Sequence, residues 1–182
     1  MNHCPRRAVL AAALLVSLAA CSQNAGVRGS GEAAQMINLT NAAGASLGSV
    51  ALSEGAGGVT MIVNASGMAP GPHGIHLHEA GRCEGPKFES AGKHWNPGLK
   101  QHGRDNPQGA HLGDLANLNV GAGGTATASF TVAGAMMASG ATMLADADGT
   151  ALVVHAKPDD YRTDPSGNSG DRIACAVIAP PK

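Results

Sequence analysis

Short segments in which apolar and polar residues alternate follow one another along most of the chain, from about residue 35 to the C-terminus. Alternation with a period of two is typical of β-strands with one buried face, and no stretch has the period of a convincing amphipathic helix. Gly, Pro and Asn separate the segments about every eight to twelve residues, as in an antiparallel sandwich or barrel. The predicted strands are Gln35–Thr40, Gly48–Leu52, Val59–Val63, Ile75–Glu79, Thr125–Thr131, Leu152–His155 and Ile173–Ile178.

Two long polar stretches, residues 80–114 and 156–171, interrupt this strand pattern. Loops longer than about 12–15 residues are uncommon in a compact domain unless they serve a function. We therefore predict an all-β fold, a Greek-key antiparallel β-sandwich or barrel with two long functional loops. The first of these, at about residues 80–114, is the expected metal-binding loop.

The N-terminal segment has the layout of a secretory signal. Two arginines precede an apolar run at residues 8–20, which is too short to span a bilayer. The run ends in Leu-Ala-Ala-Cys at residues 18–21, which resembles the bacterial lipobox, where Cys21 becomes the lipidated first residue. The alternative is an ordinary signal peptide cut near Ala20, which would leave Cys21 as a spare thiol. Ser22, in place of an aspartate, favours the outer membrane of a Gram-negative bacterium.

The rest of the chain is predicted to form one exported domain. We expect a signal peptide at residues 1–20, a lipidated cysteine and flexible tether at 21–32, and a β-domain at 33–182, located in the periplasm. Without the signal, ten Lys and Arg face thirteen Asp and Glu, so the mature chain is mildly acidic. Only 2% of the residues are aromatic and no basic patch is evident, so nothing indicates nucleic-acid binding.

Candidate chemistry lies in the histidines. Imidazole is a ligand that copper and zinc share, and a lone carboxylate among imidazoles favours zinc. Six imidazoles and one carboxylate are enough for two four-coordinate ions if one imidazole is shared, which predicts a dinuclear site with one copper, one zinc and redox chemistry. Six of the eight histidines and one aspartate form the ordered series His76, His78, His94, His102, His111, Asp114 and His155.

Three of these histidines fit a copper ion. His76 and His78 are two apart on a predicted strand, so both side chains leave the same face. His155 ends another apolar strand and can approach the same ion. An all-imidazole site of tetragonal geometry suits copper.

The remaining ligands lie in the long loop. His111 and Asp114 flank a tight turn that brings an imidazole and a carboxylate onto one ion, together with His102. Three imidazoles and a carboxylate in tetrahedral array suit zinc. His94 lies between the two groups in the sequence, so it is the natural bridge, with one ring nitrogen for each metal.

Five blocks of sequence resemble, in order, the copper–zinc superoxide dismutases. The insertion-like segment at residues 82–90 and the short second loop at 161–171 resemble the exported bacterial, lipoprotein-type branch of that family. The blocks are GIHLHE (74–79), AGKHWNP (91–97), HLGDL (111–115), VHAKPDD (154–160) and GNSGDRIAC (167–175).

The resemblance implies roles for further residues. It implies copper on His76, His78, His94 and His155, and zinc on His94, His102, His111 and Asp114. Asp159 would link His76 and His102 through their outer ring nitrogens, because a ligating imidazole is oriented by an acceptor on its far N–H. Arg172 would attract superoxide beside the copper. His73 would be a buried structural residue, whereas we read Asp160 as a solvated carboxylate.

The four cysteines can be sorted by position. Cys4 leaves with the signal and Cys21 takes lipid, which leaves Cys83 and Cys175. In an exported domain an isolated pair is expected to form a disulfide, closing a loop of about 90 residues and stabilising the fold by about 2–4 kcal/mol. Two free buried thiols are the alternative.

The function implied is an oxidoreductase that disproportionates superoxide into dioxygen and hydrogen peroxide and protects the cell envelope. His94 would bridge the metals as an imidazolate and supply a proton. A non-catalytic copper-storage lipoprotein on the same scaffold is the alternative, but storage needs neither His94 nor Arg172. A zinc hydrolase would leave His155 idle. The expected partners are superoxide, a membrane reached through Cys21, and a second copy in a possible homodimer.

Overall fold

The computed structural model describes Met1 and residues 35–182. Apart from Met1, the predicted signal, Cys21 and the tether lie outside these residues. Among the residues that are described, no helix is long and apolar enough to cross a bilayer.

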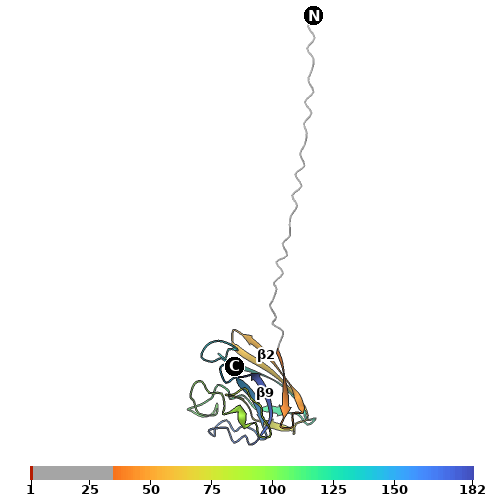
Figure 1. Cartoon of the computed structure of the whole chain (residues 1–182), viewed down its shortest axis with the longest axis vertical. Coiled ribbons are helices and arrows are strands. Elements are labelled where there is room, and N and C mark those ends of the chain that lie inside the picture. Colours follow the sequence, from red (N-terminus) through yellow and green to blue (C-terminus); the bar gives the residue numbers. More distant parts are fainter. Residues whose placement is uncertain (2–34) are drawn as a thin grey trace. The chain divides into compact units, whose positions relative to one another are not determined.

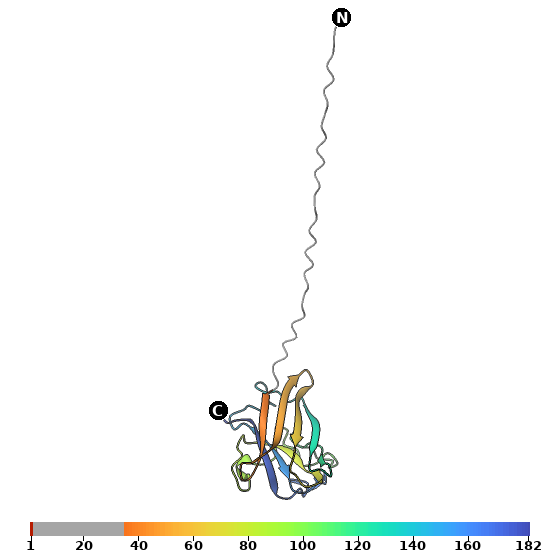
Figure 2. The same cartoon turned by 90° about the vertical axis from the view of Figure 1, so that its right-hand side faces the viewer.

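Most of the strands belong to one curved antiparallel sheet, which confirms the predicted all-β fold (Figures 1 and 2). Its strand order is β5-β8-β9-β1-β2-β3-β7, and β4 and β6 form a separate pair. The strands are β1 (Gln35–Asn41), β2 (Ser46–Gly55), β3 (Gly58–Ala65), β4 (Gly71–His73), β5 (Ile75–His78), β6 (Leu118–Val120), β7 (Ala126–Ala133), β8 (Thr150–His155) and β9 (Arg172–Ala179).

The connections give the sheet its Greek-key character. Strands β1, β2 and β3 follow one another as hairpins, and β3 pairs with β7 along its whole length, from Gly58 opposite Ala133 to Ala65 opposite Ala126. The chain then crosses from β7, at one end of the strand order, to β8, near the other end. This crossing brings β8 between β5 and β9, and so places His155 beside the two histidines of β5.

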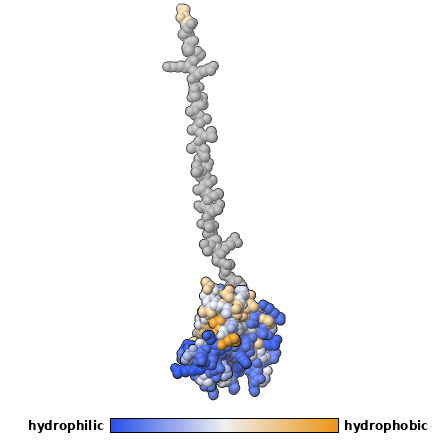
Figure 3. Space-filling view, turned by 90° about the vertical axis from the view of Figure 1, so that its left-hand side faces the viewer, coloured by the Kyte–Doolittle hydropathy of each residue, from blue (hydrophilic) through white to orange (hydrophobic). Residues whose placement is uncertain are grey.

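The core is aliphatic, as the composition predicts. Alternate residues of β3, Val59, Met61 and Val63, are fully buried, and they pack with Leu39 of β1 and Val50 of β2. At about 25 cal/mol for each Å² of apolar surface removed from water, burial of such side chains is the main force that closes the sheet. The face seen in Figure 3 is mostly hydrophilic, with only a small apolar group.

A second, smaller cluster lies on the other face of β8 and β9. Strand β8 is buried on both faces, because Leu152 and Val154 join the main core while Val153 packs under the loop that follows β5. That loop contributes Phe88, which is 1% exposed, next to the single-turn 3-10 helix Glu89–Ala91. The first half of the metal-binding loop is thus anchored by packing of its own.

Two strands were not predicted. Strands β4 and β6 are only three residues long, and the pair includes Pro72, which cannot donate to a strand ladder. Such short segments lack an alternating pattern long enough to detect. The predicted strand at 75–79 ends one residue earlier, at His78, and β2 extends three residues beyond the predicted Leu52.

Candidate metal centre

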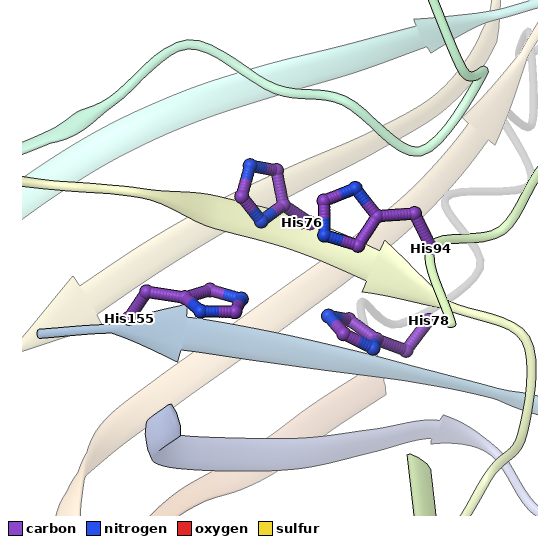
Figure 4. A group of neighbouring side chains, drawn as sticks. All are labelled: His76, His78, His94 and His155. Carbon is purple, nitrogen blue, oxygen red and sulfur yellow. The ribbon is translucent and has the colours of Figure 1, made fainter. Parts of the chain in front are cut away.

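The first histidine group is built on two strands and one loop. His76 and His78 lie on β5, which pairs with β8, and His155 is the last residue of β8. His94 joins them because the loop returns to form an isolated antiparallel bridge between His94 and His78. Their donor atoms all lie within 4.8 Å of one another, and Figure 4 shows the four rings around a common space.

Each of these rings has one buried nitrogen without a hydrogen-bond partner. They are Nδ1 of His76 and Nε2 of His78, His94 and His155. A buried polar atom without a partner typically costs about 1–3 kcal/mol, so four in one place indicate a ligand that all four share. The donor set therefore fits a metal ion that accepts four imidazoles.

The other nitrogen of each ring is held by an oxygen acceptor. Such a contact fixes the orientation of the ring and directs the free nitrogen at the shared space. The contacts are His76 Nε2 to Asp159 Oδ2 (2.9 Å), His78 Nδ1 to the Gly92 carbonyl (3.0 Å), His94 Nδ1 to Asp114 Oδ1 (2.9 Å) and His155 Nδ1 to the Gly170 carbonyl (3.1 Å).

Burial keeps this group neutral in the metal-free protein. Desolvation lowers the pKa of His94 to about 4 and that of His155 to about 3, and it also lowers the pKa values of His76 and His78. Neutral imidazole is the form that binds a metal. Near pH 7 these four side chains are therefore ready to bind without first losing protons.

The second group surrounds one carboxylate oxygen. Oδ1 of Asp114 lies 2.9, 3.0 and 3.1 Å from the Nδ1 atoms of His94, His102 and His111. Its Oδ2 accepts hydrogen bonds from the backbone N–H groups of Gly103 and His111. These four side chains form a second set whose donor atoms lie within 4.8 Å of one another. Three imidazoles and one carboxylate are the donor set that suits zinc.

His94 belongs to both groups, through a different nitrogen in each: Nε2 faces the four-histidine space and Nδ1 faces Asp114. The rings of His94 and His76 are stacked with centroids 4.0 Å apart, which keeps the two groups adjacent.

Asp159 links the two groups through the outer ring nitrogens of one histidine in each. Its two oxygens lie 2.9 Å from Nε2 of His76 and 2.9 Å from Nε2 of His102. Burial alone would lower the pKa of His102, but hydrogen bonds to Asp114 and Asp159 outweigh it and raise that pKa to about 9. Burial would likewise raise the pKa of Asp159, yet its histidine partners hold it well below its usual value. His102 is therefore a cation in the metal-free protein.

Arg172 begins β9 and is paired with His155 across the β8–β9 ladder. Its guanidinium donates hydrogen bonds to the carbonyls of Phe88 (2.6 Å) and Gly92 (2.7 Å). The Gly92 carbonyl also accepts from His78, so Arg172 and a histidine of the first group share one acceptor. The positive charge is thus fixed beside the four-histidine group.

The structure also contains the expected disulfide. Cys83 and Cys175 are bonded, with their Cα atoms 5.7 Å apart. His73 is buried, and its ring nitrogens lie 2.8 Å from the His155 carbonyl and 2.9 Å from the Ala69 carbonyl, as expected for a structural residue. Asp160 is exposed, although it accepts hydrogen bonds that organise the turn at Thr163.

The sequence matches a known family over most of the domain. The profile of the family described as copper/zinc superoxide dismutase (SODC) matches residues 46–178. Superoxide dismutase (Cu-Zn) 2 of Aquifex aeolicus is 38% identical over 172 residues, covering 93% of this chain and 96% of the relative. The chain belongs to the copper/zinc superoxide dismutase family. Copper and zinc are accordingly its cofactors, and the predicted enzyme class is supported.

Solved structures of similar proteins share the superoxide dismutase fold. A double mutant of a SOD-like protein from Bacillus subtilis, in which a tyrosine and a proline are replaced by histidine, is 39% identical with a TM-score of 0.77; the match covers 79% of this chain and 96% of that one. The Cu/Zn superoxide dismutase of Brucella abortus is 31% identical with a TM-score of 0.63, covering 80% and 99%.

Several residues that organise the centre were not singled out from the sequence. The Gly92 and Gly170 carbonyls hold His78 and His155, and backbone acceptors leave no mark in a sequence. The side-chain amide of Asn117 makes two hydrogen bonds to the backbone of Asp159. It accepts from the Asp159 N–H (2.8 Å) and donates to the Asp159 carbonyl (3.0 Å). Gly167 approaches Asp159 so closely that a Cβ atom would lie 1.8 Å from its Oδ1.

Proposed function

We propose that this chain disproportionates superoxide into dioxygen and hydrogen peroxide at a paired copper–zinc centre bridged by the His94 imidazolate. The proposal rests on His94, which belongs to both donor sets and faces each of them with a different ring nitrogen. Copper storage alone would need no such bridge. The presence of a SOD-like protein among the relatives makes this distinction worth testing directly.

The donor atoms assign each metal to one set. Copper would be held by Nδ1 of His76 and by Nε2 of His78, His94 and His155, all of which are nitrogens. Zinc would be held by Nδ1 of His94, His102 and His111 and by Oδ1 of Asp114, the set that contains the carboxylate.

The reaction consumes two superoxide ions and two protons for each dioxygen and peroxide formed. When bound, copper would supply the one-electron exchange that no side chain of this site can provide. His94 would carry one of the protons on Nε2 and donate it to the forming peroxide as a general acid.

Arg172 would recognise the substrate. Superoxide is a small anion that offers only its charge and two oxygens, and a guanidinium held in place by two carbonyls attracts such an ion. Because Arg172 lies opposite His155 in the sheet, the attraction acts next to the copper donors.

The proposed activity is tested by metal analysis and superoxide decay on the soluble domain, residues 22–182, which lacks Cys21. We expect one copper and one zinc per chain and accelerated decay. His94→Ala should lose the magnetic or spectroscopic coupling between the metals and most of the activity. A wild-type chain that holds both metals without accelerating decay would establish storage instead, and unchanged turnover in the variant would refute the bridging role.

We further propose that the enzyme is exported and held in the cell envelope by lipid on Cys21, where it protects envelope components from superoxide. The apolar run at 8–20, the lipobox-like cysteine and the Cys83–Cys175 disulfide support this location. Cys21→Ser should move the protein from the membrane fraction to the soluble periplasmic fraction. Equal membrane retention of both forms would contradict lipid anchoring.

A further inference from the structure

Tyr161, near the start of the second loop, touches several segments at once. Its backbone has a φ of 62°, an unusual conformation for a bulky aromatic residue. Its N–H donates to Oδ1 of Asp159 (2.7 Å), and its hydroxyl accepts a hydrogen bond from the backbone N–H of Asn117 (2.8 Å). Rarely populated backbone conformations persist only where the surrounding structure holds them, and they cluster at functional sites.

Tyr161 also grips the residues that directly follow His102. The Gly103 Cα is so close that a Cβ atom there would lie 2.1 Å from the Tyr161 carbonyl oxygen. The guanidinium of Arg104 lies 3.8 Å from the centre of the tyrosine ring. The N–H of Asp105 donates to the Tyr161 carbonyl (3.0 Å). Three consecutive residues of the metal-binding loop are therefore fastened to one residue of the second loop.

Both sets of contacts meet at the same carboxylate oxygen. Oδ1 of Asp159 accepts from the Tyr161 N–H and also faces Nε2 of His102 at 2.9 Å. Tyr161 thus restrains His102 in two ways. It contacts Asp159, which faces the His102 ring, and it contacts residues 103–105, which follow His102 in the chain. Residues 102–105 and Tyr161 contribute nothing to the two described apolar clusters, so polar contacts of this kind determine how often these segments open.

We propose that Tyr161 is a positioning residue that keeps His102 and Asp159 aligned and thereby sets how long the enzyme retains zinc. The inference rests on the proposed function, in which His102 is a zinc ligand. Outer contacts that orient a metal ligand commonly change metal affinity by about 10–100-fold when they are removed. Tyr161 does not itself touch either donor set, so its effect passes through Asp159 and the loop.

Two substitutions separate the contributions of the side chain. Tyr161→Phe removes only the hydroxyl, and loss of one hydrogen bond of about 1 kcal/mol should accelerate zinc release about 5-fold. Tyr161→Leu also removes the ring under Arg104 and should accelerate release by about 10–100-fold. Zinc release from the full chain loaded with both metals is followed as transfer to a chromogenic chelator. Arg162→Ala, a neighbouring exposed position, is the matched control and should release zinc at the wild-type rate.

Copper spectroscopy and unfolding rates distinguish positioning from general destabilisation. Tyr161→Leu keeps the N–H that reaches Asp159 but loses the ring and hydroxyl that hold this N–H in place. Because Asp159 also orients His76, the variant should shift the visible absorption band of bound copper at a temperature where the chain remains folded. Zinc release should exceed the rate of global unfolding of the same variant. Wild-type zinc release in Tyr161→Leu, or release no faster than unfolding with an unshifted copper band, would overturn the inference. A wild-type chain that bound no zinc would instead refute the proposed function.

Discussion

Three histidines of the first group, His76, His78 and His155, use their two ring nitrogens for different purposes. One nitrogen belongs to a donor set and the other is held by an oxygen, as in His155, whose Nδ1 contacts the Gly170 carbonyl while Nε2 has no partner. His102 differs, because both of its nitrogens face carboxylates, from Asp114 and Asp159. The ionisation of the two donor sets should therefore differ in the metal-free protein.

Zinc binding should release a proton from His102. Its pKa of about 9 means that it carries an extra proton near pH 7, and zinc must displace the proton on Nδ1. Copper added without zinc should release fewer protons, because burial lowers the pKa values of His94 and His155 to about 4 and 3 and the proposed His94 imidazolate forms only when both metals are bound. Calorimetric titration of the metal-free protein with each metal alone, in buffers of different ionisation enthalpy, measures both quantities. Equal proton release for the two metals added singly would contradict the assignment.

Gly167 should be essential for the alignment of Asp159. It has a φ of 63°, and a Cβ atom would lie 1.8 Å from Oδ1 of Asp159. We expect Gly167→Ala to displace that carboxylate and to weaken zinc binding by about 10-fold or more, measured by competition with a chelator. Gly134→Ala is the control, since Gly134 has a φ of 74° with nothing within 4 Å, so it should suffer only the left-handed backbone cost of about 1–2 kcal/mol. Equal zinc affinities in the two variants would show that the contact is unimportant.

At the scale of elements, strands β8 and β9 carry a candidate copper ligand and the arginine that we propose attracts superoxide. His155 ends β8 and Arg172 begins β9, and the pair lies side by side in the ladder. The loop after β5 completes the arrangement, because Phe88 packs on the outer face of β8 and its carbonyl holds Arg172. The disulfide between Cys83 and Cys175 ties that loop to β9.

Arg172→Ala should leave both metals bound but lower the rate of superoxide decay. Removal of a fixed charge beside the copper donors should lower the second-order rate constant by about 10-fold or more at low ionic strength and flatten its dependence on salt. Arg162→Ala removes an exposed arginine from the second loop and so changes the net charge equally. If both variants lost the same rate, net charge rather than the position of Arg172 would govern steering.

At the scale of the whole molecule, metal binding and folding stability are coupled. The sheet has a continuous aliphatic core, whereas the part of the metal-binding loop around His102 is held by polar contacts. A metal that binds the native state but not the unfolded chain stabilises the native state by mass action. Without the metals, the free energy of unfolding should depend on pH through the ionisation of these histidines.

Unfolding free energy of the metal-free protein should be greatest near pH 6.5. The pKa values of His94 and His155 are lowered in the native state. Their contribution to the free energy of unfolding is therefore complete above about pH 6.5 and is lost as the pH falls toward 3–4. The raised pKa of His102 contributes below about 6.5, and that contribution is lost as the pH rises toward 9. Urea unfolding between pH 4 and 9 measures this pH profile. On the acid side we expect the free energy of unfolding to decrease by an amount on the order of several kcal/mol. A free energy of unfolding that did not decrease on the acid side would contradict the burial of neutral imidazoles.

Local patterns in the sequence determined much of this protein. Alternation predicted seven of the nine strands that the structure describes, because side chains on a strand alternate between its faces over several residues. The donor types and their order, from His76 to His155, likewise follow from chemistry that a sequence displays. The pairing of β4 with β6 could not be predicted, since three-residue strands carry too short a pattern.

Tertiary structure alone decided how the donors are oriented. Which nitrogen of each ring faces the shared space depends on acceptors such as the Gly92 and Gly170 carbonyls, and every residue carries a carbonyl, so its use leaves no trace in the sequence. The same holds for the contacts of Tyr161 with residues 103–105, which join loops that lie far apart along the chain. Residue types therefore specify the metals, whereas long-range packing specifies the geometry in which they would be held.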